Sequence, residues 1–127
     1  MEYHSTLLNL EIYKMADAMS NLAWSIYNDL PRDHRYHLGD QLLRCTDSVG
    51  ANIAEGNGRF HYKDKLNYLY NSRGSLVEIY HWISLLNKRK LIDTETYSEF
   101  YSLQVRESKK INGFINYYKK KYNIVYK

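Results

Sequence analysis

The sequence predicts an all-α protein, folded as an antiparallel up-down-up-down four-helix bundle. Apolar residues recur every three or four positions through four long segments, which is the spacing of one helix face. Turn-forming residues are scarce, with six glycines and one proline in 127 residues, whereas a sandwich or barrel needs many turns. The segments are joined by short connections, which make consecutive helices antiparallel neighbours. Residues 1–127 are therefore expected to form a single domain, large enough to fold without a disulfide or a metal.

The first two helices are predicted at residues 5–29 and about 36–55, with a turn between them. The first ends before Pro31, because a residue that precedes proline is disfavoured in the helical region. Gly56 suits a left-handed position at the end of the second. Cys45 falls within an apolar stripe, so we interpret it as a small buried residue rather than a nucleophile. The stripes are Leu8, Ile12, Met15, Met19, Leu22 and Ile26 in the first helix, and Leu38, Leu42, Cys45, Val49 and Ile53 in the second.

The third and fourth helices are predicted at about 62–88 and from 94 to about 122. Gly74 lies in the middle of the third, where we expect it to allow close approach of another backbone, since glycine weakens a helix interior. Either Asp93 or Thr94 can cap the fourth helix. Its apolar face is wide, which predicts contact both with its own bundle and with a neighbouring subunit. The stripes are Leu66, Leu69, Arg73, Leu76, Tyr80 and Ile83 in the third helix, and Tyr97, Tyr101, Gln104, Ser108, Ile111, Ile115, Tyr118 and Tyr122 in the fourth, widened by Phe100, Leu103 and Phe114.

Two structural ion pairs are predicted between the second and third helices. If these helices form an antiparallel hairpin that turns at residues 60–61, Arg44 lies opposite Glu78. Arg73, which falls in an apolar stripe, needs an acidic partner because an unpaired buried charge is costly. The same hairpin offers it Asp47 or else Glu55, within the chain or from another subunit.

No catalytic or metal-binding constellation is complete. A di-iron bundle needs two Glu-x-x-His pairs, and Glu78 with His81 is one such pair without a second. A solvated junction explains the polar residues before the second helix as well as a surface metal site does; these are Asp33, His34, His37 and Asp40. Gly56-Asn57-Gly58 lacks the lysine of a phosphate-binding loop. We therefore expect neither enzymatic activity nor a cofactor or metal.

Positive charge collects towards the end of the sequence. The net charge is +4, yet residues 109–127 contain six lysines and no acid. Basic and aromatic residues alternate at 59–63 and at 117–122, a pattern that suits the binding of single-stranded nucleic acid. The alternative is that the lysines complement the helix dipole and the tyrosines fill the core or an interface. The predicted nucleic-acid-binding residues are Arg59, Lys109, Lys110, Lys119, Lys120 and Lys121.

The sequence carries no signal for secretion or for a membrane. Residues 1–6, Met-Glu-Tyr-His-Ser-Thr, have neither a basic nor an apolar character. The uninterrupted apolar stretches are a few residues long, far below the ~20 that span a bilayer. We therefore expect a cytoplasmic protein without membrane contact.

Three motifs in the middle of the chain resemble a known bacterial family. They are Gln41-Leu42-Leu43-Arg44, Ser48-Val49-Gly50-Ala51-Asn52-Ile53-Ala54-Glu55-Gly56 and Ser72-Arg73-Gly74-Ser75-Leu76-Val77-Glu78. These motifs are similar to those of the four-helix-bundle proteins encoded in intervening sequences of 23S rRNA genes, also called the S23 ribosomal-protein family. The resemblance covers residues 8–92 well and the fourth helix loosely.

The resemblance implies a homopentameric ring. It also implies kinship with the accessory variability protein of diversity-generating retroelements, a basic pentamer that binds nucleic acid and a reverse transcriptase. The chain departs from the family pattern at Leu43, where a second arginine is common, at His34, where an acid is common, and at His37, where glycine is common. Together with the charge pattern, the resemblance predicts a non-enzymatic, oligomeric protein that binds RNA or DNA with little sequence specificity. The alternative is a protein-interaction scaffold that binds no nucleic acid.

Overall fold

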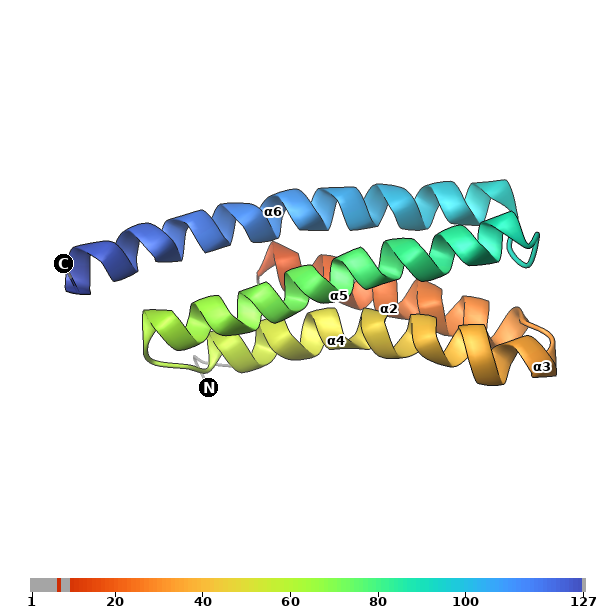
Figure 1. The fold of residues 1–127 in the computed structure, drawn as a ribbon, viewed down its shortest axis with the longest axis horizontal. Coiled ribbons are helices and arrows are strands. Elements are labelled where there is room, and N and C mark those ends of the chain that lie inside the picture. Colours follow the sequence, from red (N-terminus) through yellow and green to blue (C-terminus); the bar gives the residue numbers. More distant parts are fainter. Residues whose placement is uncertain (1–6, 8–9, 127) are drawn as a thin grey trace.

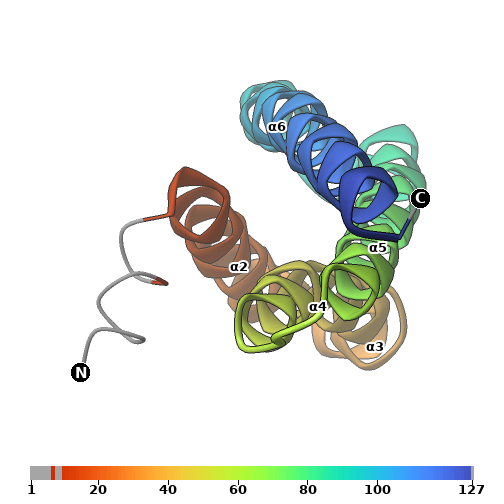
Figure 2. The same cartoon turned by 90° about the vertical axis from the view of Figure 1, so that its left-hand side faces the viewer.

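The computed structural model describes residue 7 and residues 10–126, and these contain helices and no strand (Figure 1). Each long helix runs back along the one before it, and the end-on view shows the helices arranged around a common interior (Figure 2). The predicted all-α four-helix bundle is thus confirmed. The long helices are α2 (Glu11–Asp29), α4 (Asp40–Asn57), α5 (Tyr62–Lys88) and α6 (Thr94–Tyr126). Of the predicted first helix, residues 5, 6, 8 and 9 lie outside the described residues.

The core is formed by one apolar stripe from each helix. The stripe predicted for the second helix is buried in full, which confirms its phase; it runs from Leu38 to Ile53. Cys45 lies within it, and its Sγ donates to the carbonyl of Leu42 at 3.3 Å. Burial raises the pKa of the Cys45 thiol to about 12, so the reactive thiolate does not form near neutral pH. Cys45 is a small buried residue, as predicted.

The connection between α2 and α4 is helical, in contrast to the predicted turn. Residues Arg32–His34 form the short helix α3, and Arg35–Gly39 form a π-helical turn, η1, that leads into α4. The guanidinium of Arg35 donates to the carbonyls of Tyr27 (3.1 Å), Asn28 (3.0 Å) and Leu30 (3.3 Å). These carbonyls belong to the end of α2, which otherwise leaves them without partners. The helical path after Pro31 thus brings Arg35 into a position to cap the preceding helix.

The hairpin of α4 and α5 has the predicted alignment but different contacts. Ser72 Oγ donates to the carbonyl of Val49 at 3.0 Å, and Ser75 Oγ lies 3.0 Å from Ser48 Oγ. Small hydroxyl side chains therefore occupy the seam between the two helices. Because a serine brings neither bulk nor charge, the two backbones can approach closely along this seam.

Within one chain, the predicted ion pairs of this hairpin do not form, because the charged residues point outward. Arg44 and Glu78 are both exposed, and Glu78 Oε2 accepts from Trp82 Nε1 at 3.1 Å. Arg73 is also exposed, and its Nη1 donates to Asn112 Oδ1 at 3.2 Å. Neither of its proposed acidic partners is used in the chain: Asp47 is exposed, and Glu55 pairs with Arg59. A pairing of Arg73 across a subunit boundary stays a prediction.

The two glycines that we singled out have roles different from those expected. Gly56 lies inside α4 rather than at a left-handed end, and no described glycine has a positive φ. A Cβ at Gly56 would lie 2.8 Å from the Cβ of Tyr68 on α5. At Gly74, an added Cβ would meet no atom within 4 Å. The close approach that we expected at Gly74 is therefore found at Gly56.

Replacing each glycine by alanine should change stability in opposite directions. Gly56→Ala is expected to lower the free energy of unfolding by about 1–3 kcal/mol, because α4 and α5 must separate locally. Gly74→Ala is expected to raise it by up to about 1 kcal/mol, because alanine favours an exposed helix interior. Urea unfolding followed by far-ultraviolet circular dichroism measures both. If Gly56→Ala were as stable as Gly74→Ala, the contact with Tyr68 would not limit the helix spacing.

Helix α6 begins at an Asp93 cap. Its buried face matches the predicted stripe at Gln104, Ile111 and Ile115, but Phe100 and Glu107 are buried where the stripe had Tyr101 and Ser108. Asp93 Oδ1 accepts the backbone N–H of Thr96 at 2.7 Å, and hydrogen bonding to the side chain and then to the backbone of Thr96 lowers the pKa of the Asp93 carboxyl. Phe100 is fully buried, whereas its neighbour Tyr101 is 41% exposed. The buried residues of this helix are Phe100, Gln104, Glu107, Ile111 and Ile115. None of the described helices is long and apolar enough to cross a bilayer.

Candidate nucleic-acid interface

The two basic and aromatic segments of the sequence, 59–63 and 117–122, meet at one end of the bundle. Tyr62 at the start of α5 and Tyr118 near the end of α6 have ring centroids 5.8 Å apart. A shallow hollow beside them is lined by His61 and Lys63 from one segment, by the adjoining Asp64, and by Tyr122 from the other segment. We call this surface the basic aromatic end; it comprises Phe60, His61, Tyr62, Lys63, Lys65, Tyr70, Arg73, Tyr117, Tyr118, Lys119, Lys120, Lys121 and Tyr122.

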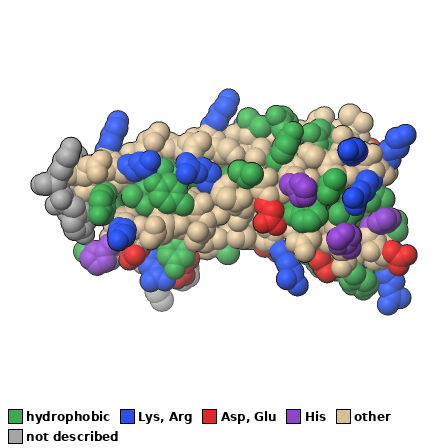
Figure 3. Space-filling model, in the orientation of Figure 1, with side chains coloured by type: hydrophobic (Ala, Val, Ile, Leu, Met, Phe, Trp, Pro, Cys, Tyr) green, Lys and Arg blue, Asp and Glu red, His purple; other side chains and the backbone are tan. Residues whose placement is uncertain are grey.

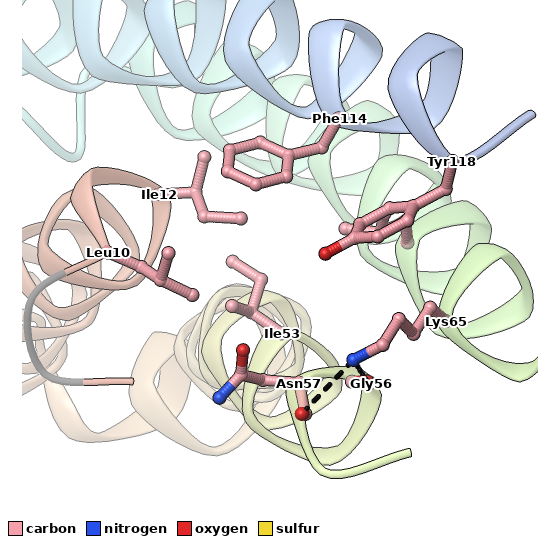
Figure 4. Close-up of a pocket in the computed structure, with 9 residues that line it drawn as sticks. Leu10, Ile12, Ile53, Gly56, Asn57, Lys65, Phe114 and Tyr118 are labelled. Atoms are coloured by element: carbon pink, nitrogen blue, oxygen red, sulfur yellow. Dashed lines mark hydrogen bonds between the residues drawn. The ribbon is translucent and has the colours of Figure 1, made fainter. Parts of the chain in front are cut away.

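Tyr118 anchors this surface to the bundle. Its ring is half-buried and packs against the core, and burial with the neighbouring Tyr117 and Tyr62 raises the pKa of its phenol. It reaches into a small cavity between the helices (Figure 4). The cavity encloses about 20 Å³, room for about one water molecule. The cavity itself is therefore too small for a ligand larger than a water molecule.

Lys65 faces the same cavity and secures the end of α4. Its Nζ donates to the carbonyls of Gly56 (3.4 Å) and Asn57 (3.3 Å) and lies 5.8 Å from the centroid of Tyr118 (Figure 4). A cation is well placed at the carbonyl end of a helix. Partial burial lowers the pKa of Lys65. Because Lys65 is held by these contacts within the fold, we do not expect it to bind a ligand.

Three outer cations of this surface, Arg73, Lys119 and Lys121, lie against tyrosine rings. Arg73 and Lys119 both face Tyr70, with their charged groups 5.0 and 5.9 Å from the ring centroid. Lys121 lies 5.4 Å from the centroid of Tyr117. A ring face attracts a cation weakly at an exposed site and, unlike a carboxylate, does not neutralise it. These groups therefore keep their charge while the rings limit their conformations.

The six residues predicted to bind nucleic acid differ in whether their charged groups already have partners in the structure. Lys119 and Lys121 face rings as described, and Lys109 and Lys120 are exposed. Lys110 donates to Glu11 Oε2, an ion pair that joins α6 to α2 and holds the pKa of Glu11 below its ordinary value. Lys127, which is in the basic segment 109–127 but is not one of the six, lies outside the described residues.

Arg59, the sixth predicted residue, is held by two neighbours. Its Nη2 lies 2.6 Å from Glu55 Oε1 and 2.8 Å from the hydroxyl of Tyr68. Its charge is therefore shared with a carboxylate, and we expect it to contribute less to anion binding than the outer lysines.

Positive charge is less concentrated in space than in the sequence. On the face that Figure 3 shows, lysine and arginine side chains occur at both ends of the bundle and between them. Lys109 and Lys120 are eleven positions apart on one helix, about 16 Å at 1.5 Å per residue. What distinguishes the basic aromatic end is thus the pairing of cations with aromatic rings. The sequence analysis did not assign Tyr70 or Arg73 to nucleic-acid binding, although their three-residue spacing on a helix places them side by side.

The core contains one ionisable group that the sequence did not indicate. Glu107 is 0% exposed, and neither of its carboxylate oxygens has a hydrogen-bond partner in the protein. Burial raises the pKa of this carboxyl to about 8, against a smaller opposing effect of Lys110. The described residues contain no cluster of three or more histidine, cysteine or acidic side chains that could hold a metal. Glu107 is therefore isolated rather than part of a metal or acid–base site.

Comparison with models of protein families found a match. The model of the 23S rRNA-intervening sequence protein family matches residues 8–113, most of the sequence. The chain belongs to this family. The family match includes the motifs of α4 and α5 but ends before Lys119, Lys120 and Lys121. No curated protein matches the chain.

A solved structure agrees with the fold of this member of the 23S rRNA-intervening sequence protein family. It is the crystal structure, at 1.70 Å resolution, of a protein of unknown function from the S23 ribosomal protein family of Bacteroides thetaiotaomicron VPI-5482. The two are 22% identical and superpose with a TM-score of 0.77, over 82% of this chain and 97% of the other. At this identity, the similarity establishes the shared helical fold.

Proposed function

We propose that this protein is a non-enzymatic, oligomeric, cytoplasmic protein that binds RNA or DNA through its basic aromatic end. The observation that carries the proposal is that two segments distant in sequence, each alternating cations with aromatic rings, are joined there by the contact between Tyr62 and Tyr118. Cations that face rings remain able to contact phosphates. Contacts to phosphates carry no sequence information, so we expect binding with little sequence preference and a strong dependence on salt.

Self-association would multiply this small surface. A second surface, distinct from the basic aromatic end, exposes apolar side chains on α5 and α6: Val77 is 67% exposed, and Tyr80 lies 5.8 Å from Tyr101 between ring centroids. Contiguous exposed apolar groups are typical of protein interfaces. We propose that this patch joins copies of the chain into a ring, a pentamer as the family resemblance implies, and thereby gathers several basic aromatic ends.

The same apolar patch supports the alternative function, a protein-interaction scaffold. In that case the patch would hold another protein, such as a reverse transcriptase, and the lysines of α6 would only be solvated. The two functions differ in whether the purified protein retains RNA at low salt.

Reversing the charge of Lys119, Lys120 and Lys121 tests the nucleic-acid proposal. We expect the triple change to glutamate to weaken RNA binding and to reduce the slope of log affinity against log salt by about 2, because each lost phosphate contact removes about 0.7 for a single strand. Affinity is measured by fluorescence anisotropy at several salt concentrations, with native mass determined on the same samples.

A matched control is available at the opposite end of the bundle. Lys88, Arg89 and Lys90 are three consecutive exposed cations at the end of α5. Their change to glutamate should leave the salt slope nearly unaltered, although it changes the net charge equally. Equal slopes for the two triple variants would assign binding to overall charge, and absence of RNA retention by the unaltered protein would favour the scaffold.

A further inference from the structure

We infer that the basic aromatic end selects single-stranded over double-stranded nucleic acid, by stacking unpaired bases on Tyr117 and Phe60. This inference rests on the proposed function and names its substrate class. Both rings are exposed to solvent: Phe60 is 90% exposed and Tyr117 is 53% exposed.

The ring of Tyr117 is one end of a continuous row. It meets Tyr118 edge-on, with centroids 5.1 Å apart and planes at 76°, and Tyr118 in turn contacts Tyr62. In this contact one ring presents its edge to the face of the other, and it holds Tyr117 within the row. The row crosses from α6 to α5 and thus provides a path that a flexible strand can follow.

A cation accompanies the exposed ring. Lys121 Nζ lies 5.4 Å from the centroid of Tyr117, on the same helix four residues later. A strand whose base stacks on a tyrosine needs a positive group nearby for its phosphate, and ring and cation together are how proteins hold single strands.

Phe60 adds a second platform at the same end. It lies two residues before Tyr62, in the connection between α4 and α5, and its ring meets that of His61 edge-on, with centroids 5.3 Å apart. Packing of the fold does not account for a phenylalanine left 90% exposed.

Duplex nucleic acid cannot use these rings in the same way. Its bases are paired and stacked on each other, so a protein ring reaches a base face only after unstacking, which costs energy. A duplex can therefore use the cations alone, whereas a single strand can use both cations and rings.

The test compares one RNA strand of mixed sequence, without self-complementarity, with the same strand annealed to its complement. Binding is measured by fluorescence anisotropy at one moderate salt concentration. We expect the single strand to bind at least about tenfold more tightly. Replacing Tyr117 and Phe60 together by leucine should weaken single-strand binding by about tenfold or more, in the range of base–aromatic stacking, and leave duplex binding unchanged. Both side chains are largely exposed, so the variant should fold, as circular dichroism would verify.

Trp24→Leu is the matched control. Trp24 is an exposed aromatic side chain on α2, stacked on Tyr27 and outside the basic aromatic end, and its loss should not alter either affinity. Equal affinity for single strand and duplex, or equal loss of both in the Tyr117 and Phe60 variant, would overturn the inference and leave the proposed function standing. Absence of binding to either form would instead overturn the proposed function.

Discussion

Replacing Glu107 by glutamine is expected to stabilise the protein by about 4–5 kcal/mol at pH 8.5 but by only about 1.4 kcal/mol at pH 5.5. The folded chain holds the Glu107 proton with a pKa of about 8, whereas the ordinary value is 4.5. Between these values the folded chain keeps a proton that the unfolded chain releases. The free energy of unfolding therefore falls as pH rises from about 4.5 to about 8. Glutamine has the same shape, carries no charge and removes this dependence.

The size of the effect follows from the pKa difference. One pKa unit corresponds to about 1.4 kcal/mol, so the glutamine variant should gain up to about 4–5 kcal/mol over the unaltered protein at pH 8.5. Urea unfolding of both proteins from pH 5.5 to pH 8.5 measures this difference. All other ionisable groups are common to the two proteins, so the difference between their stabilities isolates Glu107.

Glu99→Gln provides the control for this measurement. Glu99 is an exposed residue on the same helix, and its replacement should leave the pH dependence unchanged. If Glu107→Gln followed the same stability profile as the unaltered protein, the carboxyl of Glu107 would have to be paired or hydrated in solution.

Phe100→Ala is expected to lower the free energy of unfolding by about 3–5 kcal/mol. Phe100 is fully buried among the apolar side chains of the core, and its removal loses both the burial of a ring and the filling of its space. A loss of this size approaches the whole stability of a small domain. Thermal and urea unfolding should therefore show a variant that is folded marginally or not at all.

The neighbouring residue gives a direct comparison. Tyr101 is 41% exposed and contacts the rings of Tyr80 and Tyr97, so Tyr101→Ala should cost distinctly less than Phe100→Ala. Equal costs for the two changes would mean that α6 is turned so that both rings share the core.

This comparison also marks how far the sequence predicts the fold. The third helix has the predicted bounds, and the predicted stripe of the second is fully buried. The buried face of a helix is harder to predict where the helix is rich in tyrosine, because tyrosine suits the core and the surface equally well. The sequence pattern placed Arg73 and Tyr80 in the core, whereas the buried residues are their neighbours Ser72 and Ile79.

Two features of the candidate sites could not be predicted from sequence patterns. Burial of Glu107 contradicts the general rule that charged residues stay at the surface, so no pattern would select it. The basic and aromatic segments were recognised separately, but their meeting depends on how α5 and α6 are aligned, which tertiary packing decides. Contacts such as that between Arg73 and Asn112 depend on the same alignment.

The ion pair between Lys110 and Glu11 connects residues 99 positions apart, and Leu10, Phe114 and Tyr118 pack against the core on the same side. Contacts between residues so far apart in the sequence form slowly during folding, because closing the long intervening loop costs conformational entropy. Helices α2 and α6 therefore stabilise each other. Removing residues 110–126 of α6 would remove both the ion pair and these apolar contacts, so a change near the end of α6 would weaken the packing of the beginning of α2.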